Sequence, residues 1–149
     1  MTEVLFYHLT ESRLEDALPP LLEKSVERGW RVVVQTGSDE RRDALDAHLW
    51  TYREASFLAH GTDRADYADL QPILLTSGED TGNGATVRFL VDAAQPGEVA
   101  SYERVVFMFD GHDQDQLEAA RAHWRSLKDA GMQLTYWQQT PERRWERKA

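Results

Sequence analysis

The sequence predicts a single α/β domain with a mostly parallel, mixed central sheet and helices on both faces. The chain has 149 residues, a length that suits one compact domain. Its hydrophobic content of 41%, with five residues each of Trp, Tyr and Phe, is typical of a globular protein. Apolar runs alternate with amphipathic segments over the first fifty residues, the β-α-β-α order of a parallel sheet. No linker or repeat interrupts the chain, so we expect residues 1–149 to form one domain.

The first fifty residues contain two predicted strand–helix units. The apolar run at residues 4–9 predicts a buried strand. The turn at residues 10–12 offers caps for a helix in which leucines recur at helical spacing. The β-branched run at residues 31–35 predicts a central strand. Ser38 is expected to cap a second helix that ends near Leu49.

The rest of the chain contains four more predicted strands and one more helix. Residues 50–70 lack clean periodicity and predict a long connection with at most a short strand. The Gly82-Asn83-Gly84 segment is expected to make a hairpin-type turn, because it precedes a strand. Asp113 is expected to cap a helix that Gly131 ends, and the last strand is predicted at residues 134–137. The other three strands are predicted at residues 72–76, 86–91 and 104–109.

Composition and charge exclude several classes of protein. Without cysteine, the chain has no disulfide, no Cys-ligated metal site and no thiol nucleophile. The formal net charge of −9 argues against direct nucleic-acid binding, which normally requires a basic face. The first residues lack the pattern of a signal peptide, and no run approaches the length of a membrane span. We therefore expect a cytoplasmic protein with no membrane partner.

The charge is unevenly distributed along the chain. Residues 121–149 hold seven basic and three acidic residues, whereas the preceding part is strongly acidic. This asymmetry is typical of a localised site for an anionic partner. Basic residues near a helix C-terminus also favour the helix dipole and solubility, so charge alone leaves both interpretations open.

Motifs for catalysis, nucleotide binding and metal binding are missing from the sequence. A P-loop needs a Gly-Lys pair, which is absent, and the turns after the first two predicted strands carry acidic residues that repel phosphate. The acidic segment at residues 110–115 does not match an EF-hand and fits better as the cap of the following helix. Neither a paired-histidine zinc motif nor a serine nucleophile elbow occurs. We expect a Rossmann-like fold without a nucleotide site, and no enzyme activity, cofactor or metal.

The last predicted helix carries a pattern that favours binding of a partner. Its apolar residues share one stripe, and three basic residues flank that stripe. An apolar groove edged by positive charge would suit an acidic peptide with a hydrophobic anchor, since Arg binds carboxylates in a bidentate manner. Alternatively, the stripe belongs to the core and the basic residues form a solvated face. The stripe consists of Leu117, Ala120, Trp124, Leu127 and Gly131, and the flank of Arg121, Arg125 and Lys128.

Several short motifs occur in a fixed order along nearly the whole chain. In the first half they are Phe6-Tyr7-x-Leu9, Gly29-x-Arg31-Val32, Leu45-Asp46-x-x-Leu49-Trp50, Phe57-Leu58-Ala59-His60-Gly61 and Gln71-Pro72-Ile73. In the second half they are Arg104-Val105-x-x-Met108-Phe109-Asp110, Ala120-Arg121-x-x-Trp124, Gly131 and Tyr136-Trp137-Gln138-Gln139. Each motif is weak singly, but in this order they make the chain similar to the chi subunit family of bacterial DNA polymerase III.

The resemblance implies a non-catalytic accessory subunit of the clamp-loader assembly. Members of the family bind a small partner subunit, psi. On a separate surface they bind the C-terminal tail of single-stranded DNA-binding protein, which is acidic and ends in Pro-Phe with a free carboxylate. The alternatives are a purely structural bridging subunit without tail binding and a nucleotide-binding α/β enzyme.

The resemblance also implies residues for tail binding, but it does not locate the surface that faces psi. Arg121 matches the key tail-binding arginine of the family, and Trp124 stands at its neighbouring aromatic position. Trp50 and Phe57 match aromatic positions that help to line the pocket. The basic position of the family one turn before Arg121 is Leu117 here, and Arg125 and Lys128 are the two candidates to supply that charge instead. The candidate tail-binding residues are Arg121, Trp124, Trp50, Phe57, Arg125 and Lys128.

Overall fold

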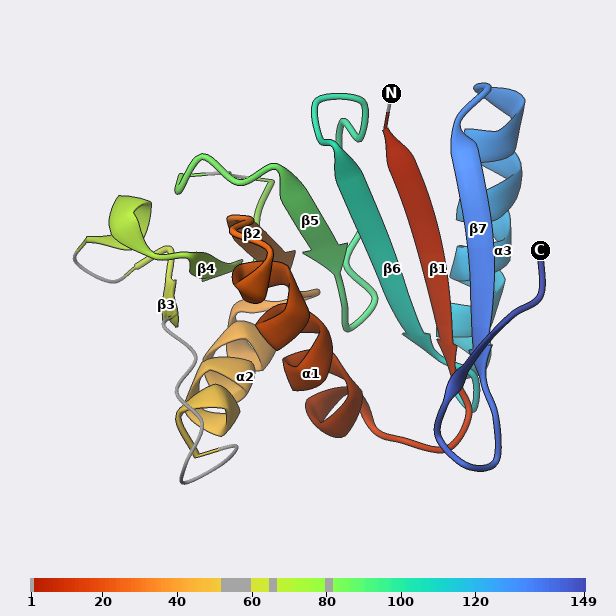
Figure 1. The fold of residues 1–149 in the computed structure, drawn as a ribbon, viewed down its shortest axis with the longest axis horizontal. Helices are drawn as coiled ribbons and strands as arrows, with labels where there is room; N and C mark the ends of the chain where they lie inside the picture. Colours follow the sequence, from red (N-terminus) through yellow and green to blue (C-terminus); the bar gives the residue numbers. More distant parts are fainter. Residues whose placement is uncertain (1, 52–59, 65–66, 80–81) are drawn as a thin grey trace.

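The structure, a computed structural model, describes residues 2–51, 60–64, 67–79 and 82–149. Within these residues, eight strands form one sheet in the order β3-β4-β2-β5-β6-β1-β7-β8 (Figure 1). The predicted α/β class with a mostly parallel, mixed sheet is confirmed, because only β7 and β8 pair in antiparallel orientation among the described strands. The elements are β1 (Glu3–Leu9), α1 (Leu14–Glu27), β2 (Val32–Gln35), α2 (Asp39–Thr51), β3 (His60–Thr62), the 3-10 helix η1 (Ala68–Leu70), β4 (Ile73–Thr76), β5 (Val87–Leu90), β6 (Arg104–Asp110), α3 (Gln114–Asp129), β7 (Gln133–Gln139) and β8 (Trp145–Arg147).

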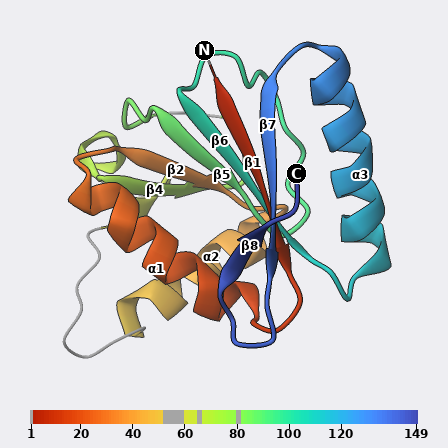
Figure 2. The same cartoon turned by 45° about the vertical axis from the view of Figure 1, so that its right-hand side comes forward.

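Helices cover both faces of the sheet, as the sequence predicts (Figure 2). α1 and α2 pack on one face, where Leu18, Leu22 and Leu45 are buried. α3 packs on the opposite face through buried Ala120 and the partly buried side chains around it. Full burial of each such leucine stabilises the fold by about 1.5–3 kcal/mol. The two apolar clusters, one on each face of the sheet, therefore hold the helices in place.

The two predicted helix caps at Ser38 and Asp113 are confirmed. Ser38 Oγ accepts a hydrogen bond from the backbone N–H of Arg41 at 3.2 Å. Asp113 Oδ1 accepts hydrogen bonds from the N–H groups of Asp115 and Gln116 at 3.0 and 3.2 Å. Both caps satisfy N–H groups that the first turn of a helix leaves without a partner. The start of α3, which positions the basic flank, is therefore defined locally.

Two prolines, Pro19 and Pro20, lie inside α1 without ending it. Pro19 has no N–H, so the carbonyl of Glu15, four residues earlier, loses its usual helical partner. His48 of α2 supplies a replacement, since its Nε2 donates a hydrogen bond to that carbonyl at 2.8 Å. The proline that weakens α1 thus creates a link between α1 and α2.

The turn between β1 and α1 differs from the prediction, because it does not cap the helix. Arg13 is the N-cap residue and makes no side-chain capping bond. Instead, Gln139 Oε1 at the end of β7 accepts hydrogen bonds from the N–H groups of Thr10, Glu11 and Ser12 at 3.2, 3.0 and 3.0 Å. The partner of this turn lies more than one hundred residues away, so no local pattern indicates it.

The prediction of a hairpin-type turn at Gly82-Asn83-Gly84 is wrong. β4 and β5 each pair with β2 in parallel, so the connection between them crosses from one side of β2 to the other. The buried Asn83 side chain donates hydrogen bonds to the carbonyls of Val32 and Gln71, both at 3.0 Å. A glycine-flanked asparagine therefore ties its loop to the start of β2 and to the residue after η1, and it does not close a hairpin.

The prediction that residues 134–137 are the last strand is incomplete, because β8 follows and pairs with β7. Trp145 of β8 packs edge-on against Tyr7 of β1, with ring centroids 4.7 Å apart. This aromatic contact holds a polar tail on the sheet. The predicted connection at residues 50–70 begins two residues too early, because α2 extends to Thr51; in the described part of the remainder, β3 and η1 are the regular elements. None of the described helices is both long and apolar enough to span a membrane.

Candidate functional site

The apolar stripe of α3 is the face that packs on the sheet. Ala120 is buried, and Leu117, Trp124 and Leu127 are partly buried against the same core cluster. The stripe is therefore not an open groove, and the interpretation of the stripe as core is confirmed. Leu117, where the resemblance led us to expect a basic residue, is one of these packed residues, so α3 has no charge at that place.

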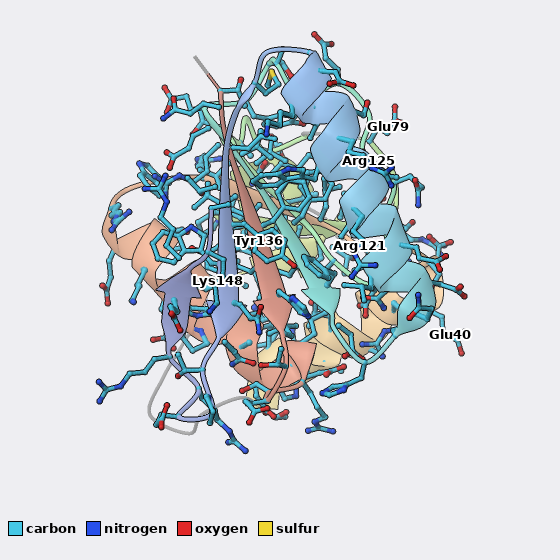
Figure 3. All side chains as sticks on the ribbon, turned by 90° about the vertical axis from the view of Figure 1, so that its right-hand side faces the viewer. Glu40, Glu79, Arg121, Arg125, Tyr136 and Lys148 are labelled. Carbon is cyan, nitrogen blue, oxygen red and sulfur yellow. The ribbon has the colours of Figure 1, made fainter. Side chains whose placement is uncertain are left out.

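The basic flank of α3 is exposed. The side chains of Arg121, Arg125 and Lys128 form no ion pair with any carboxylate among the described residues. Arg121 lies one turn before Trp124 and Lys128 one turn after it, on the side of α3 towards β7. Arg121, Arg125, Tyr136 and Lys148 appear on one face of the molecule in Figure 3. These cations are available to an anionic partner.

An aromatic cluster borders the basic flank. Trp124 contacts Phe6 of β1 and Tyr136 of β7 edge-on, with centroid distances of 5.3 and 5.7 Å. Tyr136 and Trp124 are both only partly buried. A partly exposed aromatic surface beside unpaired guanidinium groups can bind a hydrophobic side chain and a carboxylate at adjacent places. We call Arg121, Trp124, Arg125, Lys128 and Tyr136 the α3 patch.

Sequence reasoning did not select two titratable groups as site residues: Tyr136, which belongs to the α3 patch, and His8, which lies beside Tyr136. Tyr136 Oη and His8 Nδ1 are hydrogen-bonded at 2.8 Å. Burial raises the pKa of the Tyr136 hydroxyl, and the positive charge of Arg121 opposes that rise. Burial lowers the pKa of His8, with further lowering by Arg121 and His112. Arg121 therefore acts electrostatically on both partners of the pair. The sequence contains only a weak signal for these two residues. Alternate residues of a strand share a face, but the sequence did not show that the strand with His8 lies beside the strand with Tyr136.

Trp50 lies far from the α3 patch in the fold. It belongs to the end of α2, which packs on the other face of the sheet and contacts β3 and β4, whereas α3 contacts β6 and β7. Its ring lies 4.4 Å from that of His60 in β3. The structure therefore does not bring Trp50 together with Arg121 and Trp124. Phe57 lies outside the described residues.

Trp50 instead belongs to an exposed apolar surface at the β3–β4 edge. Trp50, Tyr67 and Leu70 are 55%, 73% and 61% exposed, and they are the large hydrophobic residues that stand out as exposed in the described chain. Tyr67 directly precedes η1, and Leu70 is its last residue. η1 leads into β4, and β4 pairs with β3. Large apolar side chains exposed on the same side of a fold are candidates for a protein–protein contact. We call these three residues the β3–β4 edge patch.

At the carboxyl ends of β1 and β6, where α/β folds often bind ligands, a polar hollow of about 370 Å³ lies beside the β1–α1 turn. Three N–H groups of that turn already bind the Gln139 carboxamide, so they do not form a free phosphate cradle. Among the described residues, no group of three metal-ligating side chains converges on one point.

Fold and surface together define an α/β protein with an exposed cationic helix beside a half-buried aromatic cluster. The family described as DNA polymerase III chi subunit, HolC, matches residues 1–135, and the chain belongs to this family. The chain is 28% identical to DNA polymerase III subunit chi of Pseudomonas aeruginosa over 138 residues, which are 90% of this chain and 94% of that protein. It is 23% identical over 109 residues to the probable DNA polymerase III subunit chi of Rickettsia prowazekii, covering 73% of this chain and 66% of that protein.

Proposed function

We propose that the protein is a non-catalytic accessory subunit of the replicative DNA polymerase III. In this role it links the clamp loader, through psi, to the acidic C-terminal tail of single-stranded DNA-binding protein. Membership of the chi subunit family supports the assignment to the polymerase complex. The two separate surfaces, the α3 patch and the β3–β4 edge patch, support a linker with two partners.

The observation that carries tail binding is the unpaired cationic flank of α3 beside Trp124. The chain as a whole has a net charge of −9 and would repel an acidic peptide over most of its surface. At the α3 patch, Arg121 is exposed and can form two charge-assisted hydrogen bonds with a terminal carboxylate. Arg125 and Lys128 then attract the acidic residues that precede the tail end. Trp124 offers an apolar surface for the last side chain.

The location of Trp50 changes the assignment of the aromatic residues. Because Trp50 lies on the opposite face from α3, we assign it to the contact with psi and not to the tail pocket. The β3–β4 edge patch has the large exposed apolar side chains that a permanent subunit contact requires.

Calorimetric titration with an acidic peptide ending in Pro-Phe tests the α3 patch. Arg121→Ala should weaken binding by about 1.5–3 kcal/mol, and Arg121→Lys should restore only part, because lysine lacks the planar fork. Arg144→Ala, an exposed arginine of the β7–β8 connection, is the matched control and should bind like the wild type. The amidated peptide should bind wild type and Arg121→Ala about equally. If the amide binds the wild type as well as the free acid does, Arg121 does not hold the carboxylate. If neither peptide binds, a purely structural bridging subunit is favoured.

Trp50→Ala tests the second surface. Binding to purified psi from the same organism should weaken by about 1–3 kcal/mol, the usual loss for an interface tryptophan, while tail-peptide affinity stays unchanged. Glu40→Ala, at the other end of α2, is the control and should leave psi binding intact. The opposite result, a loss of tail affinity with intact psi binding, would assign Trp50 to the tail pocket.

A further inference from the structure

Tyr136 and His8 form a hydrogen-bonded pair that has no role in the proposed function so far. The two side chains lie on the same face of adjacent parallel strands, since Phe6 of β1 is in register with Tyr136 of β7. Their hydrogen bond, 2.8 Å between Oη and Nδ1, joins the aromatic cluster to the carboxyl end of β1. Tyr136 is only partly buried, and its hydroxyl is close enough to Arg121 for the positive charge of Arg121 to lower its pKa.

The His8 ring is held in place on three sides. It stacks on Phe109 with centroids 4.9 Å apart and stands perpendicular to the Tyr136 ring. The third neighbour is Gly111, where any added Cβ would collide with His8 Nε2. The imidazole therefore presents its Nδ1 edge to Tyr136 in a fixed orientation.

Charged and titratable groups face His8 from each element around it. Arg121 of α3 and His112 of the β6–α3 connection lower its pKa, in addition to the larger effect of burial, while Asp110 at the end of β6 raises it. Tyr136 of β7 completes the set through the hydrogen bond. His8 is therefore neutral in the free protein near neutral pH, and an added negative charge beside Arg121 would favour its protonated form.

We propose that Tyr136 is a second carboxylate-binding group of the α3 patch, and that His8 is a positioning residue that orients the Tyr136 hydroxyl towards the bound carboxylate. This inference rests on the proposed tail-binding function. When Nδ1–H donates to Oη, the phenolic O–H is free to donate outward to a carboxylate held by Arg121. When Nδ1 instead accepts, the phenolic proton is used towards His8 and only oxygen lone pairs face the ligand.

Because the outward orientation of the Tyr136 O–H requires a hydrogen on His8 Nδ1, peptide binding depends on the protonation of His8. A protonated His8 always carries Nδ1–H, and its positive charge lies near the incoming carboxylate. Binding therefore takes up a proton from solvent onto His8 where the pH lies between the lowered pKa of His8 in the free protein and its higher pKa in the complex. Affinity for the peptide rises as the pH falls.

The test is the pH dependence of peptide affinity, measured with an acidic peptide that ends in Pro-Phe with a free carboxylate. Between about pH 7.5 and 5.5 aspartate and terminal carboxyl groups stay ionised, so the change reports on histidine. The dissociation constant for the wild type should fall about three- to tenfold over this range, within the limit for one linked proton. Calorimetry in buffers of different ionisation enthalpy should show proton uptake on binding.

Three variants separate orientation from charge. Tyr136→Phe should weaken binding about three- to tenfold at the lower pH and reduce the pH dependence to the part due to the charge of His8, with an unchanged thermal midpoint. His8→Asn keeps a donor near the position of Nδ1 but does not titrate, so it should bind with an affinity that does not vary over this pH range. His123→Asn is the matched control, because His123 stacks on Phe107 at the other side of α3 and also has a pKa lowered by burial. This control should keep the pH dependence of the wild type.

Two results distinguish failure of this inference from failure of the proposed function. If the free acid binds more tightly than the amide but with an affinity independent of pH, or if Tyr136→Phe binds like the wild type, the roles of Tyr136 and His8 are refuted while Arg121 keeps its role. If neither the free acid nor the amide binds at either pH, the tail-binding function fails and this inference fails with it.

Discussion

Removal of the Gln139 side chain should cause a large loss of stability for a residue that lies outside the hydrophobic core. Gln139 is buried, and its carboxamide makes four hydrogen bonds to the β1–α1 turn. Oε1 accepts from the N–H groups of Thr10, Glu11 and Ser12, and Nε2 donates to Ser12 Oγ at 3.0 Å. Gln139→Ala removes all four and leaves three neighbouring N–H groups without their protein partner.

The expected loss follows from these contacts. A typical intramolecular hydrogen bond contributes about 1 kcal/mol net, and a buried donor without a partner costs about 1–3 kcal/mol. The polar hollow beside the turn allows water to replace some of the hydrogen bonds of the carboxamide. The loss of stability should therefore lie near the lower end of the range obtained by adding these contributions. We expect Gln139→Ala to reduce the free energy of unfolding by about 2–4 kcal/mol. For a domain of this size the thermal midpoint should fall by about 5–12 °C.

Urea denaturation followed by tryptophan fluorescence measures this loss. Gln138→Ala is the matched control, because Gln138 is the neighbouring residue on the opposite face of β7 and should change stability by less than about 0.5 kcal/mol. Gln139→Glu should retain most of the stability at neutral pH, since a carboxylate also accepts three N–H groups. This retained part should be lost on acidification, because the folded protein would lower the pKa of the new carboxyl group. Equal stability of Gln139→Ala and Gln138→Ala would show that the turn does not depend on the carboxamide.

Two further predictions concern local stability. Asp113→Ala should reduce the free energy of unfolding by about 1 kcal/mol in chemical denaturation, because it removes the N-cap of α3, and an unchanged stability would contradict the cap assignment. Burial raises the pKa of Glu15, but the hydrogen bond from Arg41 at 2.6 Å, a backbone hydrogen bond and the positive charges of Arg41 and Arg13 together lower it below the ordinary value of 4.5. The interaction of Glu15 with Arg41 therefore stabilises the fold above pH 4.5, and this stabilisation is lost as the pH falls through the lowered pKa of Glu15. Glu15→Gln should flatten the dependence of the free energy of unfolding on pH in this acid range. An unchanged pH dependence would contradict the Glu15–Arg41 ion pair.

Features that depend on neighbours in the chain could be predicted from the sequence. The apolar run that became β1 and the β-branched run that became β2 were located because the spacing of apolar residues is a local signal. The caps at Ser38 and Asp113 were located because each side chain bonds N–H groups two or three residues further on. The family and the role of Arg121 were indicated by short motifs in a fixed order, and membership of the family is confirmed.

Contacts between distant parts of the chain were decided only by the tertiary structure. Helical spacing placed Leu117 and Trp124 on one stripe, but the stripe looks the same whether it faces a peptide or the sheet, and only packing shows that it is core. Order along the chain also did not show that Trp50 lies on the opposite face from Arg121, because the strand order determines which helices are neighbours. The His8–Tyr136 pair and the Gln139 contact each join residues more than one hundred positions apart. Local periodicity carries no information on such pairs, because they form only when parallel strands β1 and β7 are placed side by side.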